Sequence, residues 1–328
     1  SLKKADAGAK PLAKENGQGS TDAIMCISKL SVKESLPPAA KKPDPQSYSS
    51  AMLPAEVTDI DAHDDGNVQL CSQYVKEIYN YLLELELQFP IKANFLASRR
   101  DVTANMRSIL VNWLVQVHMK FNLLQETLYL TIAILDRYLQ VTENISRSKL
   151  QLVGMTAMFI AAKYEEMYSP DIGDYIYMSD NSYTKADILK METAMLKALE
   201  FSLGRPLPLH FLRRASKAGN VTVTVHTMAK YLLELTITDY GMAHIRPSLL
   251  AASSLWLSMQ LLDYGDWTTD LAYYAHFTKE ELEPVAAKIC KLVLSATSSS
   301  RNVIYNKYKN PKLECISSRG ELRSLLVQ

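Results

Sequence analysis

The stretch Met106-Arg-Ser-Ile-Leu-Val-Asn-Trp-Leu114 decides the fold of this chain. Within and just beyond it, apolar side chains recur at spacings of three and four, at Met106, Ile109, Leu110, Trp113, Leu114 and Val117. This spacing predicts one amphipathic helix over residues 103–120. Arg107 lies beside the apolar stripe, and Asp136 follows one predicted helix later. We therefore expect a structural ion pair between them that joins the two helices.

The helical pattern extends on both sides of that stretch. Upstream, apolar residues between Leu70 and Leu85 keep the same spacing and predict a leading helix. Downstream, four more helices are expected near 125–141, 146–166, 170–178 and 184–200. A break with prolines at 206 and 208 follows. The plan then restarts, with helices expected near 207–217, 223–239, 247–264, 267–275 and 278–297.

The two halves of this pattern correspond to each other. Thr184 with Asp187, and Thr278 with Glu281, have the spacing of a capping box at the start of each fifth helix. Each third helix carries small residues on one face, which predicts a closely packed central helix: Gly154, Ala157 and Ala161, then Ala251, Ser254 and Ser258. No strand-like alternation of any length occurs. The expected fold is all-α, with two tandem five-helix domains.

We name these domains the first box, residues 101–204, and the second box, residues 205–300. A leading helix and connection are expected at 66–100, and a C-terminal extension at 301–328. Residues 1–65 are rich in Lys, Ala, Pro, Ser and Asp and contain no Trp or Phe. Such a segment cannot bury enough apolar surface to offset its ordering entropy, so a disordered tail is predicted. Its acidic end, residues 59–65, is interpreted as a solvated linker.

Composition excludes several classes of protein. The chain has 36 basic and 35 acidic side chains and a net charge of +1, whereas a nucleic-acid binder needs a concentrated basic face. Its four cysteines are far apart, which is typical of free thiols in a reducing compartment. No apolar run reaches the roughly 18 residues that span a membrane, and no signal-peptide pattern occurs. We expect no nucleic-acid binding and no membrane insertion.

The usual patterns of catalysis are missing as well. The sequence contains no GxGxxG, GxxxxGK[ST], HExxH or GxSxG, and its six histidines never pair at metal-ligand spacing. Glu165 and Glu166 are adjacent, so on a helix their side chains point about 100° apart and cannot share a substrate. We expect no catalytic residue, no metal and no cofactor. The sequence is typical of a binding module.

One set of motifs resembles the cyclin family, and the similarity covers residues 69–327. The motifs are Met106-Arg-Ser-Ile-Leu110, Leu124-Gln-Glu-Thr127, Leu135-Asp-Arg-Tyr138, Lys149-Leu-Gln-Leu-Val-Gly154 and Lys163-Tyr-Glu-Glu-Met-Tyr168. The run Gly204-Arg-Pro-Leu-Pro-Leu-His-Phe-Leu-Arg-Arg-Ala-Ser-Lys217 is similar to the B-type, mitotic subgroup. Ser108 and Asn112 depart from the usual Ala and Asp, but neither belongs to the apolar stripe. The resemblance implies a protein that binds and activates a kinase.

The resemblance assigns a kinase-binding site to the first box. Its central pair falls on Lys163 and Glu192, whose donors and acceptors suit the carbonyls and exposed N–H groups of a helix start. Aligning the two halves puts Leu261 and Ala286 at the equivalent places, so only the first box has the pair. Further contact positions match Phe201, Tyr74, Ile78 and Tyr81. These four side chains either contact the kinase or pack against the protein's own boxes.

The opening stripe matches a second family surface, a patch that docks short Arg-x-Leu-type peptides from substrates and inhibitors. The matching residues are Met106, Ile109, Leu110, Trp113, Gln116, Leu150 and Gln151. A stripe of this spacing is more often core, so its residues cannot all be exposed. We expect Leu114 and Val117 to face inward, and Met106, Leu110 and Trp113 to be partly open. An exposed apolar patch of this kind marks a partner site.

A trio of cationic residues is the next candidate. His226 and Lys230 are four residues apart on one helix face, and Arg213 lies one helix earlier. Three such donors can hold a phosphorylated Ser or Thr, and B-type cyclins resemble this chain there and carry a phosphate pocket. The alternative is a solvated helix face.

In the tail, Lys14-Glu15-Asn16 matches a degradation signal that the ubiquitin ligase of mitotic cyclins recognises. The sequence and the resemblance together predict a regulatory subunit, cytoplasmic and nuclear, that activates a mitotic cyclin-dependent kinase at the G2/M transition. A rival remains, because two stacked cyclin-like boxes also occur in transcription factors that associate with nucleic acid. That class needs a zinc ribbon or a basic face, and the sequence has neither.

Overall fold

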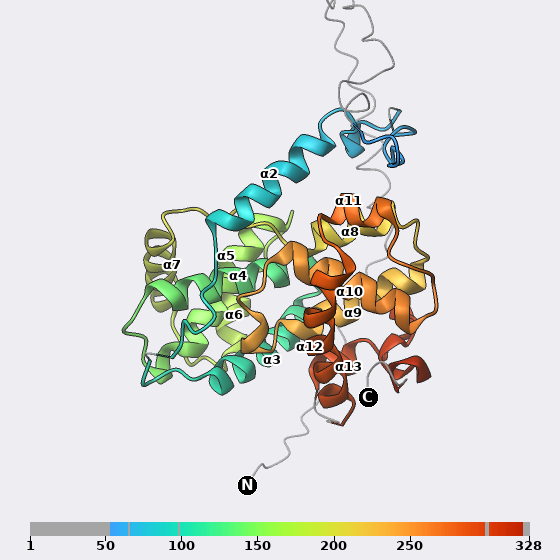
Figure 1. Ribbon diagram of the computed structural model, residues 1–328. Coiled ribbons are helices and arrows are strands. Elements are labelled where there is room, and N and C mark those ends of the chain that lie inside the picture. The colour runs from blue at the N-terminus through green and yellow to red at the C-terminus, as the bar shows by residue number, and fades with distance from the viewer. Residues whose placement is uncertain (1–52, 65, 98, 299–301, 324–328) are drawn as a thin grey trace, which may run out of the picture. The chain divides into compact units, whose positions relative to one another are not determined.

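Each predicted apolar stripe forms a helix in the computed structural model, which describes residues 53–64, 66–97, 99–298 and 302–323. Within these ranges no strand occurs. The first box contains α3 (Ala104–Phe121), α4 (Gln125–Val141), α5 (Leu150–Glu165), α6 (Ile172–Met178) and α7 (Lys185–Ala198). The second box contains α8 (Pro208–Ala218), α9 (Val223–Thr236), α10 (Pro247–Leu261), α11 (Thr269–Ala275) and α12 (Lys279–Ser298) (Figure 1).

Helix ends follow the local sequence. Thr103 caps α3, because its side chain accepts a hydrogen bond from the backbone N–H of Met106. Asn122 ends α3 in the left-handed conformation, with a φ of 54°. Thr184 and Asp187 form the predicted capping box of α7. Local caps therefore fix where the stripes become helices.

The third helix of each box is central, as predicted. Leu152, Val153 and nearly every following residue of α5 are buried until Lys163, and α10 is buried along almost its whole length. Gly154 permits the closest approach. A Cβ atom at that position would lie 2.8 Å from Cδ1 of Leu110 on α3. A larger residue at this position would force the Leu110 side chain to move.

The C-terminal extension continues the fold of the second box. Helix α13 (Val303–Lys307) follows α12, and its end is held by the buried carboxylate of Glu234 on α9. Glu234 accepts hydrogen bonds from Lys307 Nζ at 2.5 Å and Tyr308 Oη at 2.9 Å, and from Gln125 Nε2 of the first box at 2.8 Å. This charge is buried but paired, as a buried carboxylate must be.

The leading helix α2 (Val75–Gln88) packs on the second box, although the chain continues from it into the first. Tyr79 Oη donates a hydrogen bond to the backbone carbonyl of His210 at 3.0 Å. At the other end of α2, the buried carboxylate of Glu86 accepts hydrogen bonds from Ser248 N at 3.1 Å and Ser248 Oγ at 2.6 Å. The second box therefore holds α2 at two points.

The interpretation of residues 59–65 as a solvated linker is wrong for its central residue. The side chain of Asp61 is buried, with 5% of its surface exposed. Its two oxygens accept hydrogen bonds from the Arg214 guanidinium at 2.6 Å each, and Lys217 Nζ donates another at 2.7 Å. Residues 53–64 thus pack on the second box. Most of the predicted tail, including Lys14-Glu15-Asn16, lies outside the described residues.

Candidate functional site

The predicted kinase-binding pair is brought together in the first box. Lys163 is in the last turn of α5 and Glu192 is on α7, and their side chains form an ion pair. The Glu192 side chain is nearly buried and that of Lys163 is half-exposed. Lys163 Nζ also lies 4.3 Å from the ring centroid of Phe159, which is a cation–π contact. The equivalent residues of the second box, Leu261 and Ala286, are both buried in its core.

Four further predicted contact residues are exposed rather than packed against the boxes. Tyr74 is 65% exposed and Phe201 is 68% exposed, and Ile78 and Tyr81 are also open. Helix α2 therefore has two apolar faces: one packs on the second box, and the other has no covering element among the described residues. Exposed aromatic side chains of this size are typical of partner surfaces. Tyr74, Tyr81 and Phe201 keep more than half of their surface open, so packing against the protein's own boxes does not account for these three.

Phe201 is presented by an unusual backbone. After α7, Glu200 and Phe201 both have positive φ values, of 52° and 57°. A bulky residue rarely adopts this left-handed conformation, and such strain is often associated with function. The N–H of Phe201 donates to the carbonyl of Leu196 at 2.9 Å, which fixes the turn. The helix end thus holds an exposed phenylalanine at the edge of the first box.

Sequence reasoning missed part of this surface. Met167 and Tyr168, directly after α5, are the most exposed large apolar side chains of the first box, and Tyr164 in the last turn of α5 is also exposed. Glu166 next to them has a structural role, since its carboxylate accepts hydrogen bonds from Leu124 N at 2.7 Å and Thr127 Oγ1 at 2.5 Å. The sequence did contain a signal for this surface: Met167 and Tyr168 are apolar, although they follow a helix end, where polar loop residues are usual.

The opening stripe divides between core and surface, as predicted, but with one difference. Leu114 and Val117 are buried, and Met106 and Trp113 are partly open. Leu110, which was expected to be partly open, is only 6% exposed because α5 approaches it at Gly154. Ile109 is the open residue, at 62% exposed.

These residues line a groove of about 370 Å³ between α3 and the start of α5. The lining residues are Met106, Ile109, Leu110, Trp113, Arg147, Leu150 and Gln151. Arg147 is an addition to the predicted set, and it adds a positive charge to a groove whose other lining residues, apart from Gln151, are apolar. Gln116 is exposed but does not line the groove. Six of the seven residues predicted to form a docking patch therefore line a concave surface, with Leu110 as part of its floor.

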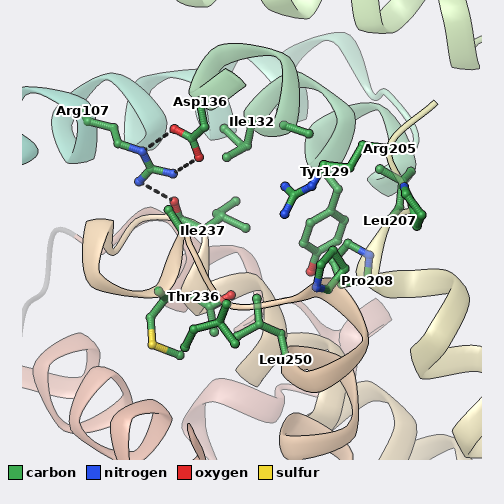
Figure 2. A pocket seen from close by; sticks show the side chains of 16 residues that line it. Arg107, Tyr129, Ile132, Asp136, Arg205, Leu207, Pro208, Thr236, Ile237 and Leu250 are labelled. Atoms are coloured by element: carbon green, nitrogen blue, oxygen red, sulfur yellow. Dashed lines mark hydrogen bonds and ion pairs between the residues drawn. The ribbon is translucent and has the colours of Figure 1, made fainter. Parts of the chain in front are cut away.

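Arg107 and Asp136 form the predicted ion pair, and the pair does more than join two helices. Arg107 Nε and Nη2 donate to the two oxygens of Asp136 at 2.6 Å each, and both side chains are buried. Arg107 Nη1 donates to the backbone carbonyl of Ile237 in the second box at 3.1 Å. Figure 2 shows these three bonds beside a cavity of about 60 Å³ that residues of both boxes line. The pair is therefore a lock between the boxes.

The predicted cationic trio also lies close together. Arg213 on α8 forms an ion pair with Glu126 of the first box, and His226 Nδ1 lies 2.8 Å from Ser216 Oγ. Burial, together with the charges of Lys230 and Arg213, lowers the pKa of His226 to about 4. At neutral pH the trio therefore consists of two cations and a neutral imidazole. An anion bound beside the ring would raise the pKa of His226 and favour its protonated form.

Among the described residues, no group of three or more His, Cys, Asp and Glu side chains is arranged to hold a metal ion. In that same part of the chain, none of the helices is long and apolar enough to cross a bilayer. Three candidate sites lie on the described residues: the surface around Lys163 and Glu192, the groove and the cationic trio.

Comparison with known proteins agrees with this fold. The family described as "Cyclin, N-terminal domain" matches residues 77–204, and "Cyclin, C-terminal domain" matches residues 206–321. The chain is 53% identical to a G2/mitotic-specific cyclin-B of Patella vulgata over 280 residues, which is 85% of this chain and 68% of that protein. It is 51% identical to a G2/mitotic-specific cyclin-B2 of Bos taurus, over 86% of this chain and 71% of that protein. In Xenopus laevis, a cyclin-B1 is 49% identical, with 86% and 70% covered.

A solved structure shows the same fold. The viral cyclin from herpesvirus saimiri matches with a TM-score of 0.58 and 21% sequence identity, covering 65% of this chain and 96% of that one. The two tandem helical boxes and their exposed apolar surfaces place the chain in the class of two-box helical proteins that bind other proteins. The chain belongs to the cyclin family, and the relatives named above are mitotic cyclins of the B type.

Proposed function

We propose that the chain is a non-catalytic regulatory subunit that binds and activates a mitotic cyclin-dependent serine/threonine kinase at the G2/M transition. The observation that carries this proposal is the Lys163–Glu192 pair, which lies on the first box beside exposed apolar side chains. The second box buries Leu261 and Ala286 at the equivalent places. The B-type relatives support the same function, and the comparisons give no support to the transcription-factor alternative.

Activation follows from selective binding. A cyclin that packs on the regulatory helix of the kinase favours the state in which the kinase's own Lys–Glu pair and metal-binding groups are aligned. The shift equals the difference in the cyclin's affinity for the active and inactive states. Exposed aromatic residues from α2 and the end of α7 supply apolar contact area, while Lys163 and Glu192 supply polar groups for a helix end.

The groove and the cationic trio are assigned to other partners. The groove at Met106 and Trp113 would dock short Arg-x-Leu-type motifs of substrates and inhibitors. The trio of Arg213, His226 and Lys230 would hold a phosphorylated residue, and Glu126 would give up Arg213 to that phosphate.

Two further assignments concern regulation. The tail signal Lys14-Glu15-Asn16 would make the chain a target of a ubiquitin ligase and so of degradation. Localisation to both the cytoplasm and the nucleus is part of the same proposal.

The test is the activity of a mitotic cyclin-dependent kinase that lacks inhibitory phosphorylation, measured on a histone substrate with and without this chain. We expect strong activation by the wild type. Lys163→Ala/Glu192→Ala should weaken kinase binding roughly 30-fold, the size of an interface hot spot. Glu283→Ala/Lys288→Ala removes the same charges from exposed positions of α12 and should change nothing.

The outcomes separate the function from the site. Half-maximal activation at the same concentration of the wild type and of both variants would keep the function and reject the site. No activation by the wild type would reject the function.

A further inference from the structure

The segment that precedes α2, residues 53–64, lies along α8 and α11 of the second box; we name it the strap. The N–H of Thr58 donates to Asp270 Oδ1 at 2.8 Å, and Tyr274 Oη donates to the Thr58 carbonyl at 2.8 Å. Asp61 then enters the second box, and Asp64 pairs with Lys217 at the exit. The strap is therefore held to the second box from Thr58 to Asp64, with Asp61 between these two residues.

The centre of the strap is a buried ionic contact with aromatic walls. Asp61 and Arg214 are each only 5% exposed, and their two hydrogen bonds of 2.6 Å make a bidentate pair. The Arg214 guanidinium carbon lies 4.8 Å from the ring centroid of Tyr274 and 5.2 Å from that of Tyr79. Arg214 and Lys217 hold the pKa of Asp61 below its usual value although burial raises it. Asp61 is thus an anion at neutral pH.

This contact reaches α2 through Tyr79. Tyr79 belongs to α2, and besides the Arg214 contact it donates its hydrogen bond to the His210 carbonyl on α8. Lys76 on α2 lies 3.8 Å from Asp59 of the strap. The opposite face of the same helix carries the open side chains of Tyr74 and Tyr81. The strap, α8 and the inner face of α2 therefore form one packed unit.

We infer that Asp61 is a positioning residue for kinase binding: by holding Arg214 against Tyr79, it sets the direction in which α2 presents its open aromatic face. This inference rests on the proposed function, because it assigns that face to the kinase. It also gives the second box a part in kinase affinity without requiring contact with the kinase.

The physical reason is the behaviour of a buried charge. Without the Asp61 carboxylate, Arg214 has no counterion in a buried site, so the guanidinium turns toward water. That movement removes the contact between the Arg214 guanidinium and the Tyr79 ring, so the N-terminal half of α2 is free to adopt other orientations. The far end stays held by Glu86 and Ser248. If the competent direction is then populated about one-tenth of the time, the apparent kinase affinity falls about tenfold.

The experiment compares Asp61→Asn with Asp64→Asn in the full chain, measuring kinase affinity by titration. Both changes remove one carboxylate from Lys217, but only the first removes the partner of Arg214. Each is also made in the Tyr74→Ala/Tyr81→Ala background, which removes both aromatic side chains from the open face of α2. Amide hydrogen exchange of α2 and of the second box is followed in the same proteins, without the kinase.

We expect Asp61→Asn to weaken kinase binding about tenfold and Asp64→Asn less than about twofold. In the background without the two tyrosines, Asp61→Asn should weaken binding by less than about twofold, because only Ile78 remains of the face to be oriented. Exchange should become faster in the N-terminal half of α2 and stay unchanged in α10.

Three results would overturn the inference. They are equal effects of the two variants, an additive effect in the background lacking the tyrosines, and faster exchange throughout the second box, which would mean general destabilisation. If the wild type itself fails to bind the kinase, the proposed function fails. In that case unchanged exchange of α2 in Asp61→Asn would separately overturn the positioning role.

Discussion

Replacing Asp136 by alanine tests the lock between the boxes. The change removes both acceptors of Arg107 Nε and Nη2 and leaves a guanidinium that is only 1% exposed. Its remaining hydrogen bond, to the carbonyl of Ile237, is to a neutral group, and Asp239 attracts the guanidinium without a hydrogen bond to it. We therefore expect a large loss of stability rather than the small effect typical of a surface ion pair.

The magnitude follows from the geometry. Two hydrogen bonds to a charged group are lost, each contributing about 1.5–3 kcal/mol, so the sum is about 3–6 kcal/mol. Water can enter the adjoining cavity of about 60 Å³ and hydrate part of the guanidinium, which removes the upper part of that range. We expect the free energy of unfolding to fall by about 4 kcal/mol, in agreement with other broken buried pairs. The melting temperature should fall by roughly 8–16 °C.

Urea unfolding followed by tryptophan fluorescence measures this loss, since Trp113 reports on the first box and Trp256 and Trp267 on the second. Asp101→Ala, which removes an exposed carboxylate before α3, is the matched control and should cost under about 0.5 kcal/mol. A loss for Asp136→Ala as small as that of the control would refute the reasoning.

The double variant Arg107→Met/Asp136→Leu removes the charge as well as its partner. It should therefore be more stable than Asp136→Ala alone, with a residual cost of about 1–3 kcal/mol from the unpaired Ile237 carbonyl. A double variant less stable than the single one would show that the buried charge is not the cause.

Three other outcomes follow from the structure. Gly154→Ala should push the Leu110 side chain into the groove and lower the free energy of unfolding by about 1 kcal/mol net, after the gain in helix propensity. The affinity for a docked peptide should fall, and the affinity for the kinase should stay the same. His226, with its pKa lowered to about 4, stabilises the fold above pH 6.5 and loses that contribution as pH falls toward 4. Between pH 7 and pH 5 we expect this residue to lower the free energy of unfolding by about 1 kcal/mol, a value already halved for solvent screening. In His226→Gln, urea titrations at each pH should no longer show this loss. Lys307→Ala leaves the buried Glu234 without its cation, so limited proteolysis should cut residues 302–323 faster.

Each of these outcomes has a result that contradicts it. Unchanged peptide affinity in Gly154→Ala would mean that Leu110 does not form the floor of the groove. An unaltered pH slope in His226→Gln would assign the acid sensitivity to other buried histidines, of which His118 and His210 also have lowered pKa values. Equal proteolysis of Lys307→Ala and the wild type would mean that Glu234 does not hold the extension.

The helices and the sites were predictable to different extents. Amphipathic stripes, caps such as Thr184 with Asp187, and the small residues of α5 and α10 were visible in the sequence because each acts within one helix or across one packed face. The Arg107–Asp136 pair was predictable because both residues lie on adjacent helices of one box. The family resemblance added Lys163 and Glu192, which carry no periodic signal.

Contacts between distant, irregular segments were not predictable. Asp61 lies in an acidic run that has the composition of a linker, and its partner Arg214 is 153 residues away. No periodicity connects two such residues, and burial of a charge becomes visible only once the partner is placed. Sequence periodicity likewise could not predict the hydrogen bond from Arg107 to the Ile237 carbonyl or the ion pair between Glu126 and Arg213. The groove was predictable as a set of residues, but the depth of Leu110 depends on how closely α5 approaches.

The Lys163–Glu192 pair has a consequence for selectivity. In the free protein each charge already satisfies the other, so any ligand competes with an internal bond rather than with water alone. A ligand that offers only acceptors leaves Glu192 unpaired, and one that offers only donors leaves Lys163 unpaired; either binds with little net gain. A segment that presents carbonyls and N–H groups side by side replaces both halves of the bond at once. The pair therefore selects for ligands that present both hydrogen-bond donors and acceptors. A purely apolar ligand would have to leave this polar pair uncompensated, whatever it gains from the aromatic side chains nearby.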